Sequence, residues 1–527
     1  MESNRGTASS GGGRASFPFL PIPLIFFILT WLWASWWMGD VGRIARERSF
    51  FATDSTLMQF LWQQEFGSLW ILGRALLTLF RWPLLGGCVV AAMLSLGSWM
   101  LGYCLRLHAK WRWIQYLPAA AWMTWVAWSG FELYYQHESG RPLGTLLLGF
   151  VIVAIDGFII STFSRKPLPA IVLPPKDETR RQNLAQLALI ITLTAVPIAT
   201  TSLRHPYLRP VTRMEVQMLS QNWQAMAETA RSNATLSYRP IAAYYAIALA
   251  RTGRLTDDLF QIRLDYDTLY VRGRSNTPDI GTNYYIADCN YHAGLLRAAE
   301  HNAMEMLTMD GPSLYTLKHL TRLAILHSDF NLARKYLHII SQAPFESAFV
   351  RKYESMIASE STASQRIESD PEFASIRMCE PLTDCFESQF QEPTFLGYFA
   401  VLSSGRSIQA LYQSLMANLY SKRMNDFLLR CQPLVGQALS QSVSEGLVTQ
   451  SIKNPQILQA FPSLQMDAQR YRLFLQTVSP YIKDRAGNAQ KLFQDYRGYY
   501  PYYYFFGNLK ATRKSTAKDS PSKAGVN

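Results

Sequence analysis

Leu143–Phe163 reads LGTLLLGFVIVAIDGFIISTF, an apolar run with a single ionisable residue, Asp156. A helix needs about 20 apolar residues to cross the hydrocarbon core of a bilayer, so this run predicts a transmembrane helix. Four similar runs lie in the first 203 residues, and none follows them. The five predicted spans are Pro21–Met38, Pro83–Leu105, Trp113–Tyr135, Leu143–Phe163 and Leu184–Leu203.

The first apolar run is interpreted as a retained span. It continues directly into Trp31, Trp33, Trp36 and Trp37, where a cleaved signal peptide would have small residues. Tryptophan is enriched at the headgroup level of a bilayer. We therefore predict a five-span membrane domain over residues 17–203, preceded by a disordered tail at 1–16 that is rich in Gly and Ser.

The basic residues of the short loops predict the orientation. The loops at 106–112 and 165–181 are rich in Lys and Arg, and such loops stay in the cytoplasm. The N-terminus is then cytoplasmic, and the chain after Leu203 lies in the periplasm of an inner-membrane protein. Six arginines on the predicted outer side depart from this rule, which gives long loops and domains less weight. They are Arg43, Arg46, Arg48, Arg204, Arg209 and Arg213.

Residues 57–82 are also apolar, but we do not count them as a span. Arg74 would lie near the middle of the membrane, at a cost of roughly 2.5–3.5 kcal/mol. Arg74, Thr78 and Arg81 share one helical face, which predicts an interfacial amphipathic helix in the first outer loop. The alternative is a helix packed inside the membrane bundle, with its arginines reaching the interface.

A segment of the predicted soluble half is repeated. Gly294–Ala299 (GLLRAA) corresponds to Ser328–Ala333 (SDFNLA), 34 residues further on. This is the period of the tetratricopeptide repeat, a pair of antiparallel helices. With a degenerate unit around Gly253, it predicts a TPR-like helical repeat domain over 204–358. A generic helical array with a chance spacing remains the alternative.

The candidate binding residues are polar and aromatic side chains on the first helices of the two best repeats. Stacked helix pairs curve, and their inner helices line a concave surface that can accept a peptide. We expect these side chains to contact a protein or peptide partner, although solvated polar residues would give the same pattern. They are Asn283, Asn290, Tyr291, Lys318, Thr321 and Arg322.

The rest of the chain is predicted to be a linker over 359–392, a C-terminal helical region over 393–507 and a basic disordered tail over 508–527. The tyrosine-rich stretch Tyr499–Phe506 is expected to pack over the last helices as a cap. The net charge of +13 is explained by this tail and by the arginines that flank the spans. No recognised nucleic-acid motif accompanies it, so we expect no nucleic-acid partner.

The sequence carries no motif for a metal, a cofactor or a known catalytic site. It has no Cys–His metal spacing, no phosphate loop and no G-x-S-x-G elbow. We therefore expect no metal and no cofactor. Cys379 and Cys385 could form a disulfide in an oxidising compartment, and two free thiols are equally compatible with the sequence.

Five N-terminal spans, the stretch from Phe66–Leu69 to Trp82–Gly86, the repeat-like middle and the tyrosine-rich end occur together. In this combination the chain resembles an uncharacterised family of multi-pass membrane proteins from anaerobic Gram-negative bacteria. The resemblance implies an all-α fold in which a helical membrane domain is joined to a helical repeat domain. It implies no activity and no functional residue.

Two functions from different classes follow. The first is a membrane-anchored repeat scaffold that holds a protein or peptide partner at the cell envelope. The alternative is an envelope enzyme that resembles lipid-linked sugar transferases, with Asp40 and Asp54 in the first outer loop as candidate acids. A solvated loop carboxylate is the simpler interpretation of both residues, and the oligomeric state stays open.

Overall fold

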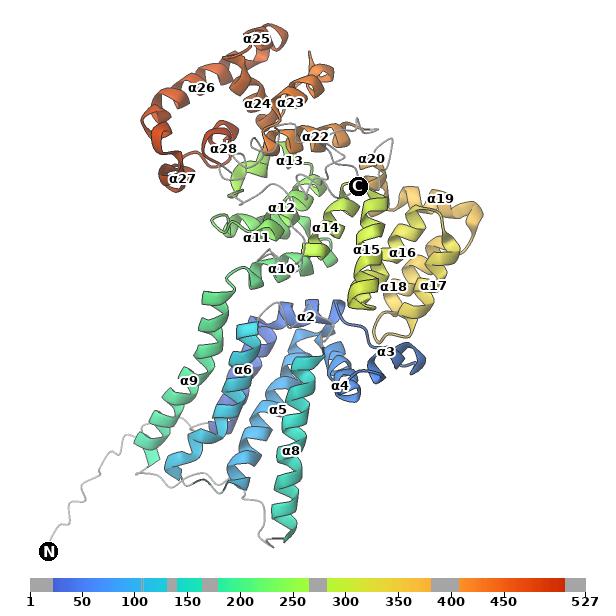
Figure 1. The fold of residues 1–527 in the computed structure, drawn as a ribbon, viewed down its shortest axis with the longest axis vertical. Helices are drawn as coiled ribbons and strands as arrows, with labels where there is room; N and C mark the ends of the chain where they lie inside the picture. Colours follow the sequence, from blue (N-terminus) through green and yellow to red (C-terminus); the bar gives the residue numbers. More distant parts are fainter. Residues whose placement is uncertain are drawn as a thin grey trace, which may run out of the picture.

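The computed structural model describes residues 22–105, 107, 109–129, 140–163, 179–264, 282–380 and 407–507. All regular elements in these residues are helices, which confirms the predicted all-α class. Figure 1 shows a bundle of long helices at one end of the molecule and a larger array of shorter helices at the other.

Three helices of the bundle are long and apolar enough to cross a membrane: α5 (Pro83–Cys104), α8 (Arg141–Phe163) and α9 (Thr179–Arg204). A fourth candidate is α1 (Ile22–Leu32), which continues through the π-helical turn η1 (Trp33–Trp37). The chain then bends by 56° into α2 (Gly39–Glu47), which lies across the end of the bundle that faces the helical array (Figure 1).

The remaining predicted span, Trp113–Tyr135, is only partly described. Its first residues belong to the 3-10 helix η4 (Ala109–Tyr116), and α6 (Leu117–Ser129) follows, packed along α9. Residues 130–139 lie outside the described part of the chain. The structure therefore shows three or four candidate spans, and the fifth stays a prediction.

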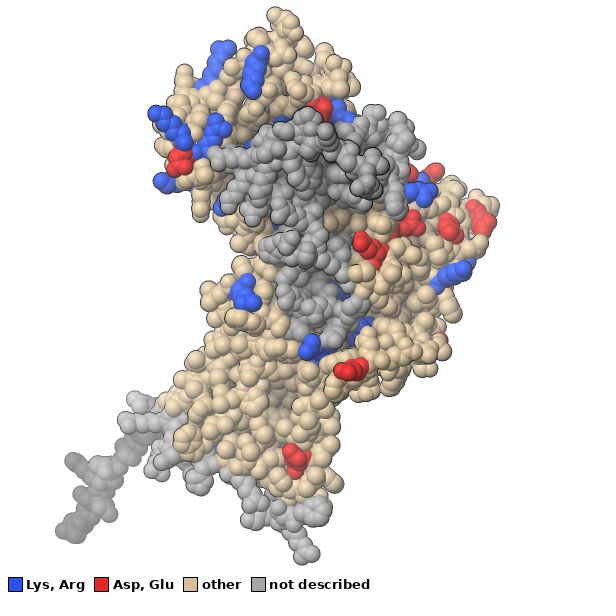
Figure 2. All heavy atoms as spheres, viewed as in Figure 1, with Lys and Arg blue, Asp and Glu red and all other residues tan. Residues whose placement is uncertain are grey.

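The flank of the bundle is apolar. On the face drawn in Figure 2, it carries little charge among the described residues. Large side chains of α8 are exposed there, among them Ile152, Ile155 and Phe158, as expected for a surface in contact with lipid. Asp156 is exposed on the same helix.

The structure corrects the prediction of one interfacial helix over 57–82, because it divides this stretch into four short helical pieces. Phe66 has a φ of +59°, and a Cβ at Gly67 would lie 1.9 Å from the carbonyl oxygen of Leu61, so the chain turns sharply there. The pieces are η2 (Thr56–Met58), α3 (Gln59–Trp62), α4 (Gly67–Leu77) and η3 (Thr78–Arg81).

Helix α4 packs against α8 at a place where glycines let the two backbones touch. A Cβ at Gly73 would lie 2.0 Å from the carbonyl oxygen of Gly140. Arg74 is buried there and donates a hydrogen bond to the carbonyl oxygen of Phe50 at 3.3 Å. Its guanidinium is therefore held inside the protein.

Five helix hairpins of the array share one turn. In each turn, a residue with positive φ donates to the carbonyl oxygen three positions back, and the next residue donates to the carbonyl oxygen five positions back. This is the Schellman pattern, which ends a helix with a residue in the left-handed region. The five residues with positive φ are Gln221, Gly253, Gly294, Ser328 and Lys422.

The pair of turns 34 residues apart, at Gly294 and Ser328, is thus confirmed as two equivalent helix hairpins. Ala299 and Ala333, which follow the two turns, are both fully buried. The hairpin helices are α10 (Leu208–Leu219), α11 (Trp223–Ser232), α12 (Arg239–Arg251), α13 (Leu255–Asp258), α14 (Thr282–His292), α15 (Leu296–Asp310), α16 (Leu314–Leu326) and α17 (Phe330–Ser341).

The predicted linker over 359–392 is corrected for its first part, because helices continue to Cys379. Asp370 accepts hydrogen bonds from two backbone N–H groups at the start of the last helix, and Pro371 occupies its first turn. Phe373 and Ile376 are fully buried, so this helix packs into the array. The helices are α18 (Ser347–Ile357), α19 (Glu360–Ser369) and α20 (Pro371–Cys379). Cys385, which could form a disulfide with Cys379, lies outside the described residues.

The C-terminal region is helical, and its tyrosine-rich end is buried, as predicted. The hydroxyl of Tyr500 donates to the carbonyl oxygen of Leu419 at 3.2 Å, and that of Tyr503 donates to the carbonyl oxygen of Tyr420 at 2.8 Å. The helices are α22 (Ile408–Ser421), α23 (Met424–Arg430), α24 (Gln441–Ser451), α25 (Gln456–Ala460), α26 (Gln465–Val478), α27 (Arg485–Phe493) and α28 (Tyr500–Phe506).

We predict that alanine is tolerated at one glycine turn and not at the other. Gly253→Ala adds only the cost of a left-handed alanine, roughly 1–2 kcal/mol, because a Cβ there meets nothing within 4 Å. Gly294→Ala adds an overpacking cost of about 1–3 kcal/mol, because its Cβ would lie 2.6 Å from the carbonyl carbon of Cys379. Thermal unfolding of the purified full-length protein measures the difference, and equal losses would contradict the turn geometry.

Candidate functional site

Four buried charged side chains join the membrane bundle to the helical array. Arg46 and Glu47 come from the end of α2, which crosses the end of the bundle (Figure 1). Lys318 comes from α16, and Glu346 immediately precedes α18. All four side chains are buried. They meet only in the folded protein, because α2 and α16 are far apart in the sequence.

These side chains form a closed ring of ion pairs, which we call the junction ring. Arg46 Nη1 lies 2.6 Å from Glu47 Oε1, and Arg46 also pairs with Glu346 through Nη2. Lys318 Nζ closes the ring, 2.7 Å from Glu47 and 2.8 Å from Glu346. Two cations and two carboxylates alternate, so the ring is neutral.

The balance of charge explains why the ring can be buried. An isolated ion loses its hydration when it is buried, at a cost of several kcal/mol, and only close partners offset that loss. Removal of one partner leaves an uncompensated charge and costs about 3–5 kcal/mol. The junction ring therefore favours one relative position of α2 and the repeats.

A second buried network lies beside the ring and again joins α2 to the array. Arg48 Nη2 lies 2.7 Å from Glu215 Oε1 on α10. The hydroxyl of Tyr244 on α12 is 2.9 Å from the same oxygen and 3.3 Å from Asp288 Oδ2. The hydroxyl of Tyr315 on α16 donates to Asp288 Oδ1 at 2.6 Å.

The protonation of Asp288 follows from this arrangement. The hydroxyl of Tyr244 has one hydrogen and can donate to only one of its two carboxylate neighbours. A neutral Asp288 resolves the conflict, because it donates to Tyr244 while Tyr244 donates to Glu215. Burial raises the pKa of Asp288 to about 7, in keeping with this assignment.

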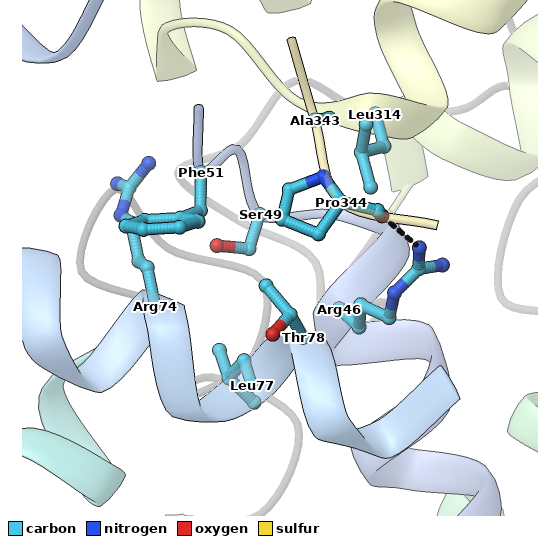
Figure 3. A pocket seen from close by; sticks show the side chains of 9 residues that line it. All are labelled: Arg46, Ser49, Phe51, Arg74, Leu77, Thr78, Leu314, Ala343 and Pro344. Atoms are coloured by element: carbon cyan, nitrogen blue, oxygen red, sulfur yellow. Dashed lines mark hydrogen bonds between the residues drawn. The ribbon is translucent and has the colours of Figure 1, made fainter. Parts of the chain in front are cut away.

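A small cavity lies between the ring and the bundle (Figure 3). Its volume is about 10 Å³, enough for about one water molecule. Arg46 Nε and Ser49 Oγ are buried and have no hydrogen-bond partner among the described residues, and both residues line this cavity. A space of this size excludes a substrate, so the geometry fits a structural joint. The lining residues are Arg46, Ser49, Phe51, Arg74, Leu77, Thr78, Leu314, Ala343 and Pro344.

The predicted binding residues do not line an open groove, and this corrects that part of the sequence analysis. Lys318 belongs to the junction ring, and Thr321 is fully buried, with its hydroxyl on the carbonyl oxygen of Leu317. Asn290 is also fully buried, and its amide donates to Asn302 at 2.8 Å.

Tyr291 and Arg322 meet one more carboxylate, that of Glu372, whose side chain is 8% exposed. The hydroxyl of Tyr291 donates to Glu372 at 3.0 Å, and Arg322 Nε lies 3.7 Å from the same carboxylate. Glu372 is on α20, so the chain itself covers this face of the repeats. Asn283 is the second residue of α14, but its side chain lies outside the described part of the structure.

The sequence analysis missed Arg46, Glu47 and Glu346 as members of a joint. One signal was available, because Arg46 and Arg48 lie on the predicted outer side against the positive-inside rule. An acidic residue, Glu47, stands between these two arginines. Charges in unfavourable places indicate that partners lie elsewhere in the chain.

The family of unknown function DUF6057 matches residues 143–507. The matched range begins in α8 and includes the repeats and the tyrosine-rich end. No curated protein and no solved structure shows significant similarity to the chain. Among the described residues, no group of three or more His, Cys, Asp or Glu side chains is arranged to hold a metal ion.

We predict that Lys318→Met lowers stability far more than Lys352→Met. Lys318→Met leaves two buried carboxylates with one cation, at a cost of about 3–5 kcal/mol. Lys352 forms a half-exposed pair with Asp370 at 3.2 Å, and such a pair contributes about 0–1 kcal/mol. Thermal unfolding of the full-length protein in detergent compares the two, and similar losses would mean that the ring does not hold the domains together.

We also predict that Asp288→Asn removes one contribution that lowers the free energy of unfolding as the pH rises. The folded protein keeps the Asp288 proton up to a pH of about 7, whereas the unfolded chain loses it near pH 3.9. Its contribution to stability is complete below pH 3.9 and is lost as the pH rises through 7, by up to about 1.4 kcal/mol per pH unit. Asparagine mimics the neutral acid, since its amide can donate to Tyr244.

The measurement is the unfolding temperature of the full-length protein between pH 5 and 7.5. Glu445, whose pKa burial also raises to about 7, adds a slope of the same sign. His292 and His319, whose pKa values burial lowers, add slopes of the opposite sign below about pH 6.5. The difference in slope between Asp288→Asn and the unmodified protein therefore isolates the contribution of Asp288. Asp495 is exposed, and Asp495→Asn is the control that leaves the slope unchanged. An unchanged slope in Asp288→Asn would show that Asp288 is ionised in the folded protein.

Proposed function

Because the chain belongs to DUF6057, a family of unknown function, membership supplies no activity, and we propose a function from the geometry. The protein is a membrane-anchored helical-repeat scaffold that binds a protein or peptide partner at the cell envelope. The junction ring is the observation that carries this proposal. A scaffold must present its surface in a fixed orientation. Two buried ion pairs of the ring, Arg46–Glu346 and Lys318–Glu47, run between α2 and the array and supply that constraint.

The proposed topology has five spans, with the N-terminus in the cytoplasm and the array in the periplasm. The helices α1, α5, α6, α8 and α9 lie side by side in the bundle (Figure 1). Consecutive helices run in opposite directions, and α9 leads into the array. The helix ends that flank the basic stretches 106–112 and 165–181 in sequence lie at the end of the bundle away from the array (Figure 1). The positive-inside rule assigns such stretches to the cytoplasmic side.

The predicted groove is filled by the chain's own α2 and α20, so the proposal assigns the partner contact to another surface. An open hollow of about 360 Å³ lies between α18 and α19, lined by Lys352, Ser355, Met356 and Arg366. Its two basic side chains favour an acidic peptide segment, and Met356 offers an adaptable apolar contact.

The test is affinity purification of the tagged full-length protein from its native membranes in mild detergent. We expect one polypeptide to copurify at near-equal stoichiometry. Lys352→Glu with Arg366→Glu should reduce its recovery at least tenfold, since two attractive charges become repulsive. Lys335 and Arg472 are exposed elsewhere, so Lys335→Glu with Arg472→Glu is the matched control. Equal recovery in both variants, or no stoichiometric polypeptide, would refute the scaffold.

One observation keeps the enzyme alternative and separates its two candidate acids. Asp40 is partly buried at the start of α2, and the charges of Arg213, Arg43 and Arg209 act on it. Asp54 is exposed and accepts hydrogen bonds from the backbone and hydroxyl of Thr56 at 2.9 and 2.8 Å. The latter is an ordinary turn, so a catalytic acid would be Asp40.

We predict that Asp40→Asn and Asp54→Asn leave partner recovery unchanged if the protein is a scaffold. Neither residue touches the hollow between α18 and α19. An enzyme would lose the phenotype-complementing activity of the full-length chain with Asp40→Asn and keep it with Asp54→Asn. Complementation of a deletion strain, with protein levels checked by immunoblot, distinguishes the two functions.

A further inference from the structure

Four arginines near the array end of the bundle remain after the buried joint has been described. Arg46 and Arg48 are neutralised by the carboxylates of the array. We call Arg43, Arg81, Arg209 and Arg213 the boundary arginines. None of them forms a salt bridge with a described residue. Their charge is therefore available to an external anion.

Three elements bring the boundary arginines together. Arg43 is on α2, which contacts η3 and α10. Arg81 ends η3, and its charge acts on Arg43. Arg209 and Arg213 are four residues apart on α10 and so share a helical face.

Among the described residues, the charges of two carboxylates, Asp40 and Glu47, act on this group. The charges of Arg213, Arg43 and Arg209 act on Asp40, but none of these guanidinium groups is close enough to the Asp40 carboxylate to form a salt bridge. Glu47 feels Arg81, but its two oxygens are already occupied by Arg46 and Lys318. Four cations thus share one uncommitted carboxylate.

Aromatic and apolar side chains place these arginines at the level of the lipid headgroups. The guanidinium of Arg209 lies 3.8 Å from the centre of the Trp37 ring, which ends the first span. Tryptophan at the end of a span marks the interface. Trp36 and Leu203, at the same ends of their spans, are 76% and 85% exposed, as residues facing acyl chains would be.

We propose that the boundary arginines bind the phosphate group of an anionic phospholipid in the leaflet that faces the array. Arg213 is exposed, and the other three are partly exposed, so a headgroup can reach all four arginines. A guanidinium binds phosphate oxygens with two parallel hydrogen bonds. The exposed Trp36 and Leu203 suit acyl chains, so the site favours a lipid over free phosphate.

The experiment uses full-length protein, purified in a neutral detergent and stripped of lipid. Native mass spectrometry then measures the binding of added phosphatidylglycerol and, in parallel, of phosphatidylcholine. Inorganic phosphate and glycerol phosphate are tested as the soluble sources of the same group. The first variant is Arg213→Gln, an exposed position that leaves the core untouched, and the second is Arg209→Gln with Arg213→Gln. Lys335→Gln with Arg472→Gln removes the same charge elsewhere.

We expect phosphatidylglycerol to bind at least tenfold more tightly than phosphatidylcholine. Each lost arginine should weaken binding of phosphatidylglycerol about tenfold, equivalent to about 1.4 kcal/mol, and Lys335→Gln with Arg472→Gln should leave it unchanged. Arg209→Lys with Arg213→Lys should fall between, because lysine keeps the charge and loses the paired hydrogen bonds.

Three results would overturn the proposal. The first is equal binding of the two lipids by the unmodified protein. The second is an unchanged preference in Arg213→Gln and in the double variant. The third is soluble phosphate binding as tightly as phosphatidylglycerol, which would assign the arginines to a soluble anion.

Discussion

The junction ring constrains the rest of the structure, because buried charges tolerate few arrangements. Each member of the ring has at least two partners in a closed neutral cycle. The members are Arg46, Glu47, Lys318 and Glu346. A displacement of α16 against α2 would separate Lys318 from Glu47 and leave each of these buried charges with a single partner. Apolar contacts between the domains could slide, whereas these ion pairs fix the position of the array on the bundle.

The same reasoning applies to the interior of the repeats. Their inner face is lined by polar and ionisable groups, and the chain satisfies these groups itself. Glu215 forms an ion pair with Arg48 and accepts a hydrogen bond from Tyr244, and Glu372 accepts a hydrogen bond from Tyr291. Repeats that keep such a face open can bind a peptide, but here α2 enters from one side and α20 from the other. The polar face thus serves to hold the domain together, and this is why the proposed partner contact is assigned to the outer surface.

Local signals made part of this fold predictable from the sequence. Length and composition identified α5, α8 and α9, and the 34-residue spacing identified the turns at Gly294 and Ser328. The turns at Gln221 and Lys422 have the same geometry, but neither glutamine nor lysine predicts a left-handed conformation, as a glycine would. The helices over 359–379 were missed because a polar, serine-rich composition also suits a loop, and only the burial of Phe373 distinguishes the two.

The site was harder to predict, because its members meet only in three dimensions. Lys318 was predicted to line a partner-binding groove, whereas it pairs with Glu47, which is 271 residues away in the sequence. Periodicity shows that a lysine lies on the inner face of a repeat, yet it cannot show what covers that face. The same limit applies to Asn290 and Thr321, whose polar side chains suggested a binding groove and are fully buried.

Helix α2 connects the two charged regions of the molecule. Glu47 at its end belongs to the junction ring, and Arg43, one turn earlier, belongs to the boundary arginines. The two residues are four positions apart and therefore lie on the same side of the helix. A short helix between two turns moves as a rigid unit, so a headgroup held by Arg43 restrains the helix that carries Arg46 and Glu47. In this proposal the orientation of the array is set by two contacts of α2, one with the array through Glu47 at its end and one with the membrane surface through Arg43 at its middle.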